Sequence, residues 1–310
     1  MEKKILIAID HSPQSMEAVL YAARMAATIT PSRFVLLHVQ PALSQYLTEE
    51  ARRKESARRT LEKLMAKNEA KSREVLDAAA RRMVRQGVEE SRVEVLTMPM
   101  SIGVADDILA LGTSKHYDAI LVARRGASSL QKWLTGSVTA NLVEHSALIP
   151  IWVVDGTVSS DKILLAADGS QSALRALDHM AFMLSGHTTH VIHVLHIRPR
   201  FQDYCEIEME AATTQDAETV LLNDDRHCME NFYQQALALL EKNGLEKDRL
   251  KVDTLDGKLS VARSIQNYAA DNAYGTVVMG RRGRSKSMFA GSVTRNFLQK
   301  ADGMALWVVP

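Results

Sequence analysis

The sequence is poor in cysteine, in long apolar runs and in excess charge of either sign. Cys205 and Cys228 are the only cysteines among 310 residues, and they do not stand in a Cys-x-x-Cys spacing, so a disulfide scaffold is excluded. The longest apolar run, at 147–154, falls far short of the ~20 residues that a membrane helix needs. The formal net charge is +1, which gives no general attraction to nucleic acid or membranes. These absences predict a soluble protein with reduced thiols.

The N-terminal sequence MEKKILIAID reads as the start of a β-strand. It lacks the apolar core and the small-residue cleavage site of a secretory signal peptide. We therefore expect a cytoplasmic protein that does not act at a membrane.

The chain contains one sequence unit twice. KILIAIDHS at 4–12 is echoed by KILLAADGS at 162–170, and LLHVQP at 36–41 by VLHIRP at 194–199. RQGVEESRVEVL at 85–96 corresponds to KNGLEKDRLKVD at 242–253. A repeat of this length predicts two similar domains, which we place at 1–156 and 157–310 with a polar linker around 155–160.

Each copy alternates short apolar runs with longer helical patterns. In the first copy, strands are predicted at 5–9, 34–39, 93–97, 119–123 and 149–154. Between them, Ser12 and Pro13 give the start signal of a helix, a stripe at 61–83 repeats at helical spacing, and Gly87 ends that helix. Strands that alternate with helices predict a parallel sheet with right-handed crossovers. The fold class is therefore α/β, with two tandem doubly wound domains.

Polar and glycine residues recur at the ends of the predicted strands, where open α/β sheets bind ligands. Asp10 and Asp168 follow the first strand of each copy, and Val39 and Ile197 end the second. After the fourth strand, RRGASSLQKWLTGSVT begins at Arg124 and RRGRSKSMFAGSVT at Arg281. Glycines followed by a helix start offer backbone N–H groups to an anion, so both loops predict phosphate binding.

This pattern resembles the universal stress protein family of the UspA type. The family signature is Gly-x2-Gly-x9-Gly-Ser/Thr, with an Asp after the first strand and a His-Val pair at the end of the second, and the resemblance covers essentially the whole chain. It implies five parallel strands in each domain, in the order 3-2-1-4-5, with helices on both faces. It also implies an adenine nucleotide, ATP or AMP with Mg²⁺ as a candidate companion, along the upper edge of the sheet.

The resemblance assigns residue roles in both copies. In the first, Asp10 would contact the ribose or adenine, the Val39 backbone would read the adenine edge, and the phosphates would be held by Gly126, Gly136, Ser137 and Val138. The corresponding residues of the second copy are Asp168, Ile197, Gly280, Gly283, Gly291, Ser292 and Val293.

Each loop departs from the family pattern in a different way. In the first, Ala123 replaces the first glycine, which matters if the backbone needs a positive φ or if the nucleotide packs against Cα. In the second, seven residues instead of nine separate Gly283 from Gly291, which shortens the loop by about 7 Å of extended chain. The shorter loop either draws Gly291 toward Gly283 or trims a segment that faces solvent.

Other charged features are interpreted as structural. The arginine pairs at 124–125 and 281–282 are interpreted as solvated charges at strand ends in preference to a phosphate clamp. Residues 51–87 hold twelve basic and five acidic side chains, but an apolar stripe makes this segment an amphipathic helix or two rather than a nucleic-acid site. The stripe comprises Leu61, Leu64, Met65, Leu76, Ala79 and Met83.

His38 and His196 are interpreted as satisfied core histidines, because neither has a second His or Cys at metal-ligand spacing. No catalytic residue and no metal ligand is assigned. Neither loop has the lysine of a P-loop.

The resemblance implies a stress-response sensor or regulator that binds an adenine nucleotide and acts through protein partners not identified by the sequence. A weak ATPase and a degenerate scaffold that binds no nucleotide remain the alternatives. The resemblance further implies that the apolar terminal strands 151–154 and 306–309 pair with each other in a pseudo-dimer, with a further homodimer left open. Such pairing would cover two exposed sheet edges.

Overall fold

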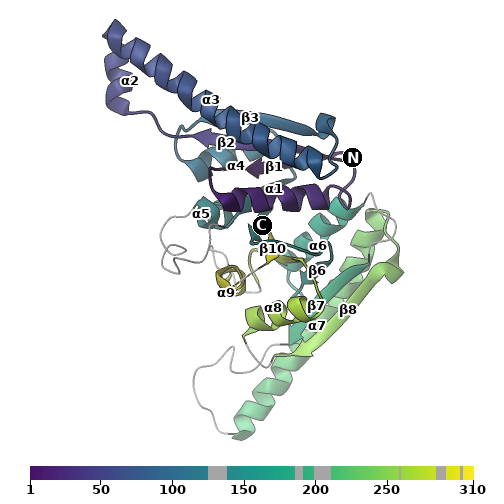
Figure 1. Ribbon diagram of the computed structural model, residues 1–310. Coiled ribbons are helices and arrows are strands. Elements are labelled where there is room, and N and C mark those ends of the chain that lie inside the picture. The colour runs from purple at the N-terminus through teal and green to yellow at the C-terminus, as the bar shows by residue number, and fades with distance from the viewer. Residues whose placement is uncertain (125–137, 186–190, 199–210, 258–259, 284–290, 301–302) are drawn as a thin grey trace. The chain divides into compact units, whose positions relative to one another are not determined.

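The computed structural model describes residues 1–124, 138–185, 191–198, 211–257, 260–283, 291–300 and 303–310. The chain divides into two compact units, one spanning 1–157 apart from 28–30 and the other spanning 158–310. Each unit is an α/β fold with parallel strands (Figure 1). In the described residues, no helix is long and apolar enough to cross a membrane.

The elements of the first unit match the predicted alternation of strands and helices. In chain order they are β1 (Lys3–Ala8), α1 (Pro13–Met25), β2 (Ser32–Gln40), α2 (Gln45–Ala51), α3 (Glu55–Arg85), β3 (Val93–Pro99), α4 (Val104–Ser114), β4 (Ala119–Ala123), α5 (Val138–His145) and β5 (Ile151–Asp155).

The second unit repeats the same plan. Its elements are β6 (Ile163–Ala166), α6 (Gln171–Leu184), β7 (Ile192–Arg198), α7 (Ala211–Lys242), β8 (Leu250–Asp256), α8 (Val261–Asp271), β9 (Thr276–Gly280), α9 (Ser292–Lys300) and β10 (Met304–Val309).

The strand order confirms the predicted topology in both units. The first has the order β3-β2-β1-β4-β5 and the second β8-β7-β6-β9-β10, which is 3-2-1-4-5 in each copy. Ile7 on β1 lies opposite Leu36 of β2 and Leu121 of β4, both in parallel pairing. Leu165 takes the equivalent place on β6, opposite Val194 and Val278. Because the central strands are covered on both faces, they are apolar without alternation.

The predicted start and stop signals lie where helices begin and end. The side chain of Ser12 caps α1, with Pro13 as its first residue, and Ser170 caps α6 by accepting from the N–H of Ala173 at 3.1 Å. Gly87 and Gly244 follow α3 and α7 with φ of +93° and +71°, a backbone conformation that glycine adopts at little cost.

The prediction for the apolar stripe of 61–83 is only partly correct. The buried residues of α3 lie in its C-terminal half, at Ser72, Leu76, Ala79 and Met83, where the helix packs on β2 and β3. Leu64 and Met65 are 37% and 44% exposed. The N-terminal half packs instead against α2, and the two helices extend beyond the edge of the sheet (Figure 1).

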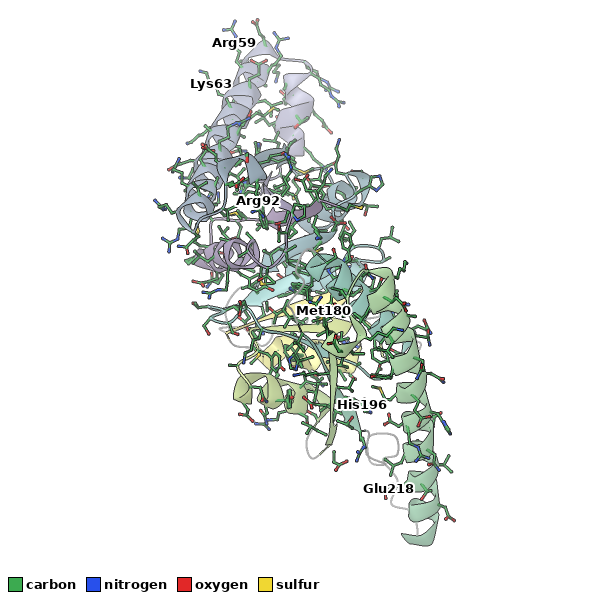
Figure 2. The ribbon with its side chains drawn as sticks, turned by 90° about the vertical axis from the view of Figure 1, so that its right-hand side faces the viewer. Arg59, Lys63, Arg92, Met180, His196 and Glu218 are labelled. Carbon is green, nitrogen blue, oxygen red and sulfur yellow. The ribbon has the colours of Figure 1, made fainter. Side chains whose placement is uncertain are left out.

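The long helices α3 and α7 differ in charge. The segment 55–85 has nine basic and five acidic side chains, whereas 211–242 has two basic and six acidic ones. Arg59 and Lys63 lie toward the free end of α3, and Glu218 lies toward the free end of α7 (Figure 2). The same position in the repeat therefore carries a basic helix in one unit and an acidic helix in the other.

Candidate functional site

A cavity of about 540 Å³ opens at the carboxyl ends of the strands of the second unit. Its wall is formed where β6, β7 and β9 end and where α8 and α9 begin. A cavity of this size suits a small organic ligand. The residues lining it are Ala166, Ala167, Asp168, Ala173, Leu195, His196, Ile197, Asp225, Ser260, Val261, Ala262, Ile265, Met279, Gly280, Arg282, Gly283, Gly291, Ser292, Val293, Thr294 and Asn296.

All seven site residues predicted for the second copy line this cavity. They come from three strand ends and from one helix start: Asp168, Ile197, Gly280, Gly283, Gly291, Ser292 and Val293. Parallel strands bring their carboxyl ends to one edge of a sheet, which is why residues more than 100 positions apart meet here.

The two glycines on either side of the shortened loop, Gly283 and Gly291, lie close together. The N–H of Gly291 donates to the carbonyl of Arg281 at 2.8 Å, and a Cβ on Gly291 would lie 3.6 Å from the backbone nitrogen of Gly283. The carbonyl of Gly291 accepts from the N–H of Arg295 at 3.1 Å, in the first turn of α9. The start of α9, with its partial positive charge, is therefore held beside Gly283.

Asp168 lies at the turn between β6 and α6. Its Oδ1 accepts from the N–H of Ser170 at 3.1 Å. Its Oδ2 would lie 2.9 Å from a Cβ placed on Gly283, so a larger residue at 283 would displace the carboxylate. The glycine and the aspartate that the sequence singled out separately are thus neighbours in space.

Gly280 has a structural role that the sequence did not reveal. A Cβ there would lie 2.4 Å from Oγ, 2.7 Å from Cβ and 2.8 Å from the carbonyl carbon of Ser172. The lack of a side chain therefore allows α6 to approach the end of β9. The sequence suggests two reasons for a glycine at this position, a positive φ and packing of the nucleotide against Cα. The close contact with Ser172 is a third reason. Ser172 is buried, and its Oγ has no hydrogen-bond partner among the described residues.

The interpretation of the arginine pairs as solvated charges was wrong for two of them. Arg281 is only 5% exposed, and burial lowers its pKa, as do the nearby charges of Arg282 and Arg175. Arg124 in the first unit forms an ion pair with Asp155 at 3.2 Å, with both side chains largely buried. Arg282 lines the cavity and places a cation in its wall. Arg125 lies outside the described residues.

His196, which is labelled in Figure 2, is buried and hydrogen-bonded, as predicted. It also forms part of the cavity wall. Its Nδ1 lies 2.9 Å from the carbonyl oxygen of Ala167, and its Nε2 lies 2.8 Å from Oδ2 of Asp225 on α7. A carbonyl oxygen only accepts, so Nδ1 carries a proton. A further proton then lies between Nε2 and the carboxyl group, and the two side chains form one hydrogen-bonded unit.

Sequence reasoning missed Asp225, which is 5% exposed. The signal was the register of α7: Asp225 shares its buried face with Phe232, Ala236 and Leu240. An acidic residue on the apolar stripe of a helix needs a partner, and His196 is that partner.

In the first unit the described site residues lie at the equivalent strand ends. Oδ1 of Asp10 accepts from the N–H of Ser12 at 2.9 Å and also from the hydroxyl groups of Ser12 and Ser15. Val39 lies near the end of β2, and Val138 is the first residue of α5. The other predicted residues, Gly126, Gly136 and Ser137, lie outside the described residues.

His38 is the counterpart of His196 and is also buried and bonded, as predicted. Its Nδ1 lies 2.8 Å from Oγ of Ser72 on α3, and its ring packs edge-on against His11 with 5.0 Å between centroids. Burial lowers its pKa, and the proximity of His11 lowers it further.

Among the described residues, no group of three or more His, Cys, Asp or Glu side chains could hold a metal ion. The cavity of the second unit has apolar walls from Leu195, Val261 and Ile265, together with a loop of glycines, a helix start and one arginine. This combination can enclose a ligand that has a flat apolar part and an anionic part.

Comparison with known proteins gives a family match over both copies. The sequence profile of the Universal stress protein family matches residues 1–155 and again residues 159–310. No significant match was found among curated proteins.

Solved structures share the fold at low sequence identity. A universal stress protein from Archaeoglobus fulgidus DSM 4304 aligns with a TM-score of 0.61 and 20% identity, covering 99% of this chain and 95% of that one. A functionally unknown protein from Pseudomonas aeruginosa PAO1 aligns with a TM-score of 0.55 and 17% identity, covering 99% and 92%.

Proposed function

The chain belongs to the universal stress protein family, and we propose that it binds an adenine nucleotide, ATP or AMP, in the cavity of its second unit. Through that binding it would act as a sensor or regulator in the stress response, with protein partners yet to be identified. One observation carries the proposal: the seven residues that the family resemblance assigns to the second copy line a single cavity of about 540 Å³.

The chemistry of the wall supports a definite orientation for the ligand. The phosphates would take the N–H groups at Gly283 and at the start of α9, since these groups suit an anion, and Arg282 adds a cation there. Asp168 would accept from the ribose hydroxyls. If Mg²⁺ accompanies ATP, it would be held mainly by phosphate oxygens with one or two carboxylates, and Asp168 lies beside the loop.

We propose a second site on the equivalent residues of the first unit. Its described members, Asp10, Val39 and Val138, lie at the ends of β1 and β2 and at the start of α5. Gly126, Gly136 and Ser137 complete the set by sequence, and their loop keeps the nine-residue spacing of the family.

The test is calorimetric titration of ATP, ADP and AMP into the wild-type chain and into two loop variants, Gly291→Asp and Gly136→Asp. A carboxylate at Gly291 would stand where a phosphate is expected, so we expect Gly291→Asp to abolish binding in the second unit. Ala238→Asp serves as the control, because it adds the same charge on an exposed face of α7 that does not line the cavity. No binding to wild type at millimolar concentrations would reject the proposal and favour a scaffold.

A slow ATPase remains the second candidate, because Arg282 places a cation in the cavity wall. Phosphate release by wild type that exceeds release by Gly291→Asp would support hydrolysis. If the two proteins release phosphate at the same rate, the site does not hydrolyse ATP, and binding of the nucleotide is the proposed function that is left.

A further inference from the structure

A row of basic side chains follows one exposed face of α3. Its members stand four residues apart, which places them along one side of the helix: Arg59, Lys63, Lys67 and Lys71. Arg59 forms an ion pair with Glu55 of the same helix at 2.7 Å, and Lys71 forms one with Glu74 at 2.9 Å. Lys63 and Lys67 form no ion pair with any residue that the structure describes. Because like charges four residues apart repel each other, this basic row does not stabilise α3 itself.

The basic row also begins where a helix disfavours cations. Arg59 lies in the second turn of α3 and follows Arg58, close to the helix start with its partial positive charge. This half of the helix packs against α2 and extends beyond the edge of the sheet (Figure 1). Leu64, one turn before Lys67, is 37% exposed. The basic row and this leucine are therefore open to a partner from outside the first unit.

The long helix of the second unit carries a row of the opposite charge, at the same spacing of four residues. Asp216, Val220 and Asp224 are all exposed, and Val220 is 67% exposed. Glu218, toward the free end of the helix, adds another acid (Figure 2). The segment 211–225 contains four acidic residues and no basic one. We refer to Asp216, Val220 and Asp224 as the acidic row.

The two rows match in spacing as well as in charge. Residues eight apart on a helix are separated by about 12 Å along its axis. This spacing holds for Asp216 and Asp224 and also for Lys63 and Lys71, so two carboxylates of one row can face two ammonium groups of the other. Val220 would then pack on the aliphatic stem of the lysine between them.

The charge of the whole chain favours a partner of its own kind. The segment 52–71 has eight basic and three acidic residues, yet the net charge of the chain is only +1. The basic charge is thus not an overall excess that would attract nucleic acid or an acidic membrane. It is balanced by acidic charge elsewhere in the same chain, and the two kinds of charge are separated onto two helices.

We propose that the chain binds a second copy of itself, with the basic row of one copy against the acidic row of the other. Each copy carries both surfaces, so the contact is heterologous and repeats from copy to copy until the assembly closes. Two copies form a closed assembly if both contacts are made at once. The proposal is independent of nucleotide binding, because neither row includes a residue that lines the cavity.

The first experiment measures the mass of the full chain by sedimentation velocity over a range of protein concentrations, at about 0.05 M and about 0.5 M salt. We expect assemblies of two or more copies at the lower salt concentration. The dissociation constant should rise at least about tenfold at the higher one, because salt screens charges on exposed side chains.

The second experiment reverses each row in turn and then mixes the two variants. Lys63→Glu with Lys67→Glu reverses the basic row, and Asp216→Lys with Asp224→Lys reverses the acidic row. Each variant alone should associate at least about tenfold more weakly than wild type, because like charges then face each other. An equimolar mixture should associate like wild type, since the two reversed rows match and the two unchanged rows match. Restored association also shows that both variants are folded.

A matched control changes the charge of α3 by the same amount outside the basic row. Arg81→Glu with Arg85→Glu alters two exposed positions in the half of α3 that packs on the sheet. We expect this variant to associate like wild type. Weakening as large as that from Lys63→Glu with Lys67→Glu would show that only the net charge matters, and would overturn the proposal.

Three further outcomes would contradict the contact between copies. The first is a wild-type chain that stays monomeric at low salt up to about 0.5 mM, a concentration at which even weak complexes form. The second is association that neither reversed variant weakens, since it would use another surface. The third is a mixture that does not associate although circular dichroism shows both variants folded. If a monomeric wild type instead binds vesicles of acidic phospholipid or duplex DNA, and Lys63→Glu with Lys67→Glu abolishes that binding, the basic row serves a polyanion.

Discussion

The two units place a histidine at the same strand end and surround it differently. His38 on β2 bonds to a hydroxyl group of α3, whereas His196 on β7 bonds to a carboxyl group of α7. The residue after the aspartate that follows the first strand of each unit differs as well. It is His11 in the first unit, where its ring packs on His38, and Gly169 in the second.

Gly169 allows the long helix α7 to pack closely against the turn that follows β6. It has φ of +78°, and a Cβ there would lie 3.0 Å from the carbonyl carbon and the Cβ of Cys228. The backbone of α7 therefore packs directly against this glycine, one turn of helix beyond Asp225. The repeat preserves the sheet and its crossovers, while a few residues that differ between the copies set the polar network at the carboxyl edge of the sheet.

The largest effect should come from removing the partner of each histidine. We expect Asp225→Ala to cost about 2 to 3 kcal/mol of stability, because a buried hydrogen bond to an ionisable group is lost. Ser72→Ala in the first unit should cost about 1 kcal/mol, since the lost bond joins a hydroxyl to an imidazole. Urea unfolding, with hydrogen exchange read separately at β7 and β2, measures both. If the two substitutions lower the free energy of unfolding equally, the hydrogen bonds to His196 and His38 do not differ in strength.

A smaller effect is expected from exchanging the residues that end the fourth strands. Gly280→Ala should destabilise the second unit by about 2 kcal/mol, because the new methyl group would overlap Ser172 of α6. The reverse change, Ala123→Gly, removes a methyl group at a strand end and should cost less than about 1 kcal/mol. Urea unfolding of both variants tests this prediction. If Gly280→Ala leaves the free energy of unfolding unchanged, α6 can shift away from β9 without a loss of stability.

The smallest expected effect is a pH dependence of stability that arises from His179 in the second unit. His179 of α6 packs edge-on against Trp307 with 5.8 Å between ring centroids, and burial lowers its pKa to about 3. Its counterpart in the first unit is the buried Tyr21.

Between about pH 6.5 and pH 3, the unfolded chain binds a proton at His179 that the folded chain does not. Stability of the second unit should therefore fall as pH decreases through this window and be fully present above it. We expect His179→Tyr to reduce the loss between pH 7 and pH 4 by on the order of 1 to 2 kcal/mol. Thermal melts of both proteins across this range provide the test, and parallel pH profiles would contradict it.

The fold could be predicted because its determinants are local and repeated. Apolar runs such as 5–9 and 119–123 define buried strands, Ser12 and Ser170 mark helix starts, and two copies with the same order support each other. The extent of α3 on the sheet could not be predicted in this way. Leu64 and Met65 continue the helical spacing of Leu76 and Met83, and only the position of the sheet edge leaves them exposed.

The site was predictable where its residues follow strands directly. Asp168, Gly283 and Gly291 are close in space because parallel strands end together, and the sequence order of the strands contains that information. Asp225 comes from the side of a long helix, whose rotation depends on packing against Gly169 and α6. The contact between Gly280 and Ser172 likewise depends on the distance between a helix and a strand, which no spacing in the sequence records.

Gly169 also makes two positions of the second unit, 169 and 225, depend on each other although they lie far apart in the sequence. A residue with a side chain at 169 would hold α7 away, and an aspartate at 225 would then face a histidine that it could not reach. A buried acid without its partner is costly, so selection would oppose it. A glycine at 169 is therefore a precondition for the carboxyl group at 225. The first unit has His11 at the position that matches Gly169, and its histidine bonds to the hydroxyl of Ser72.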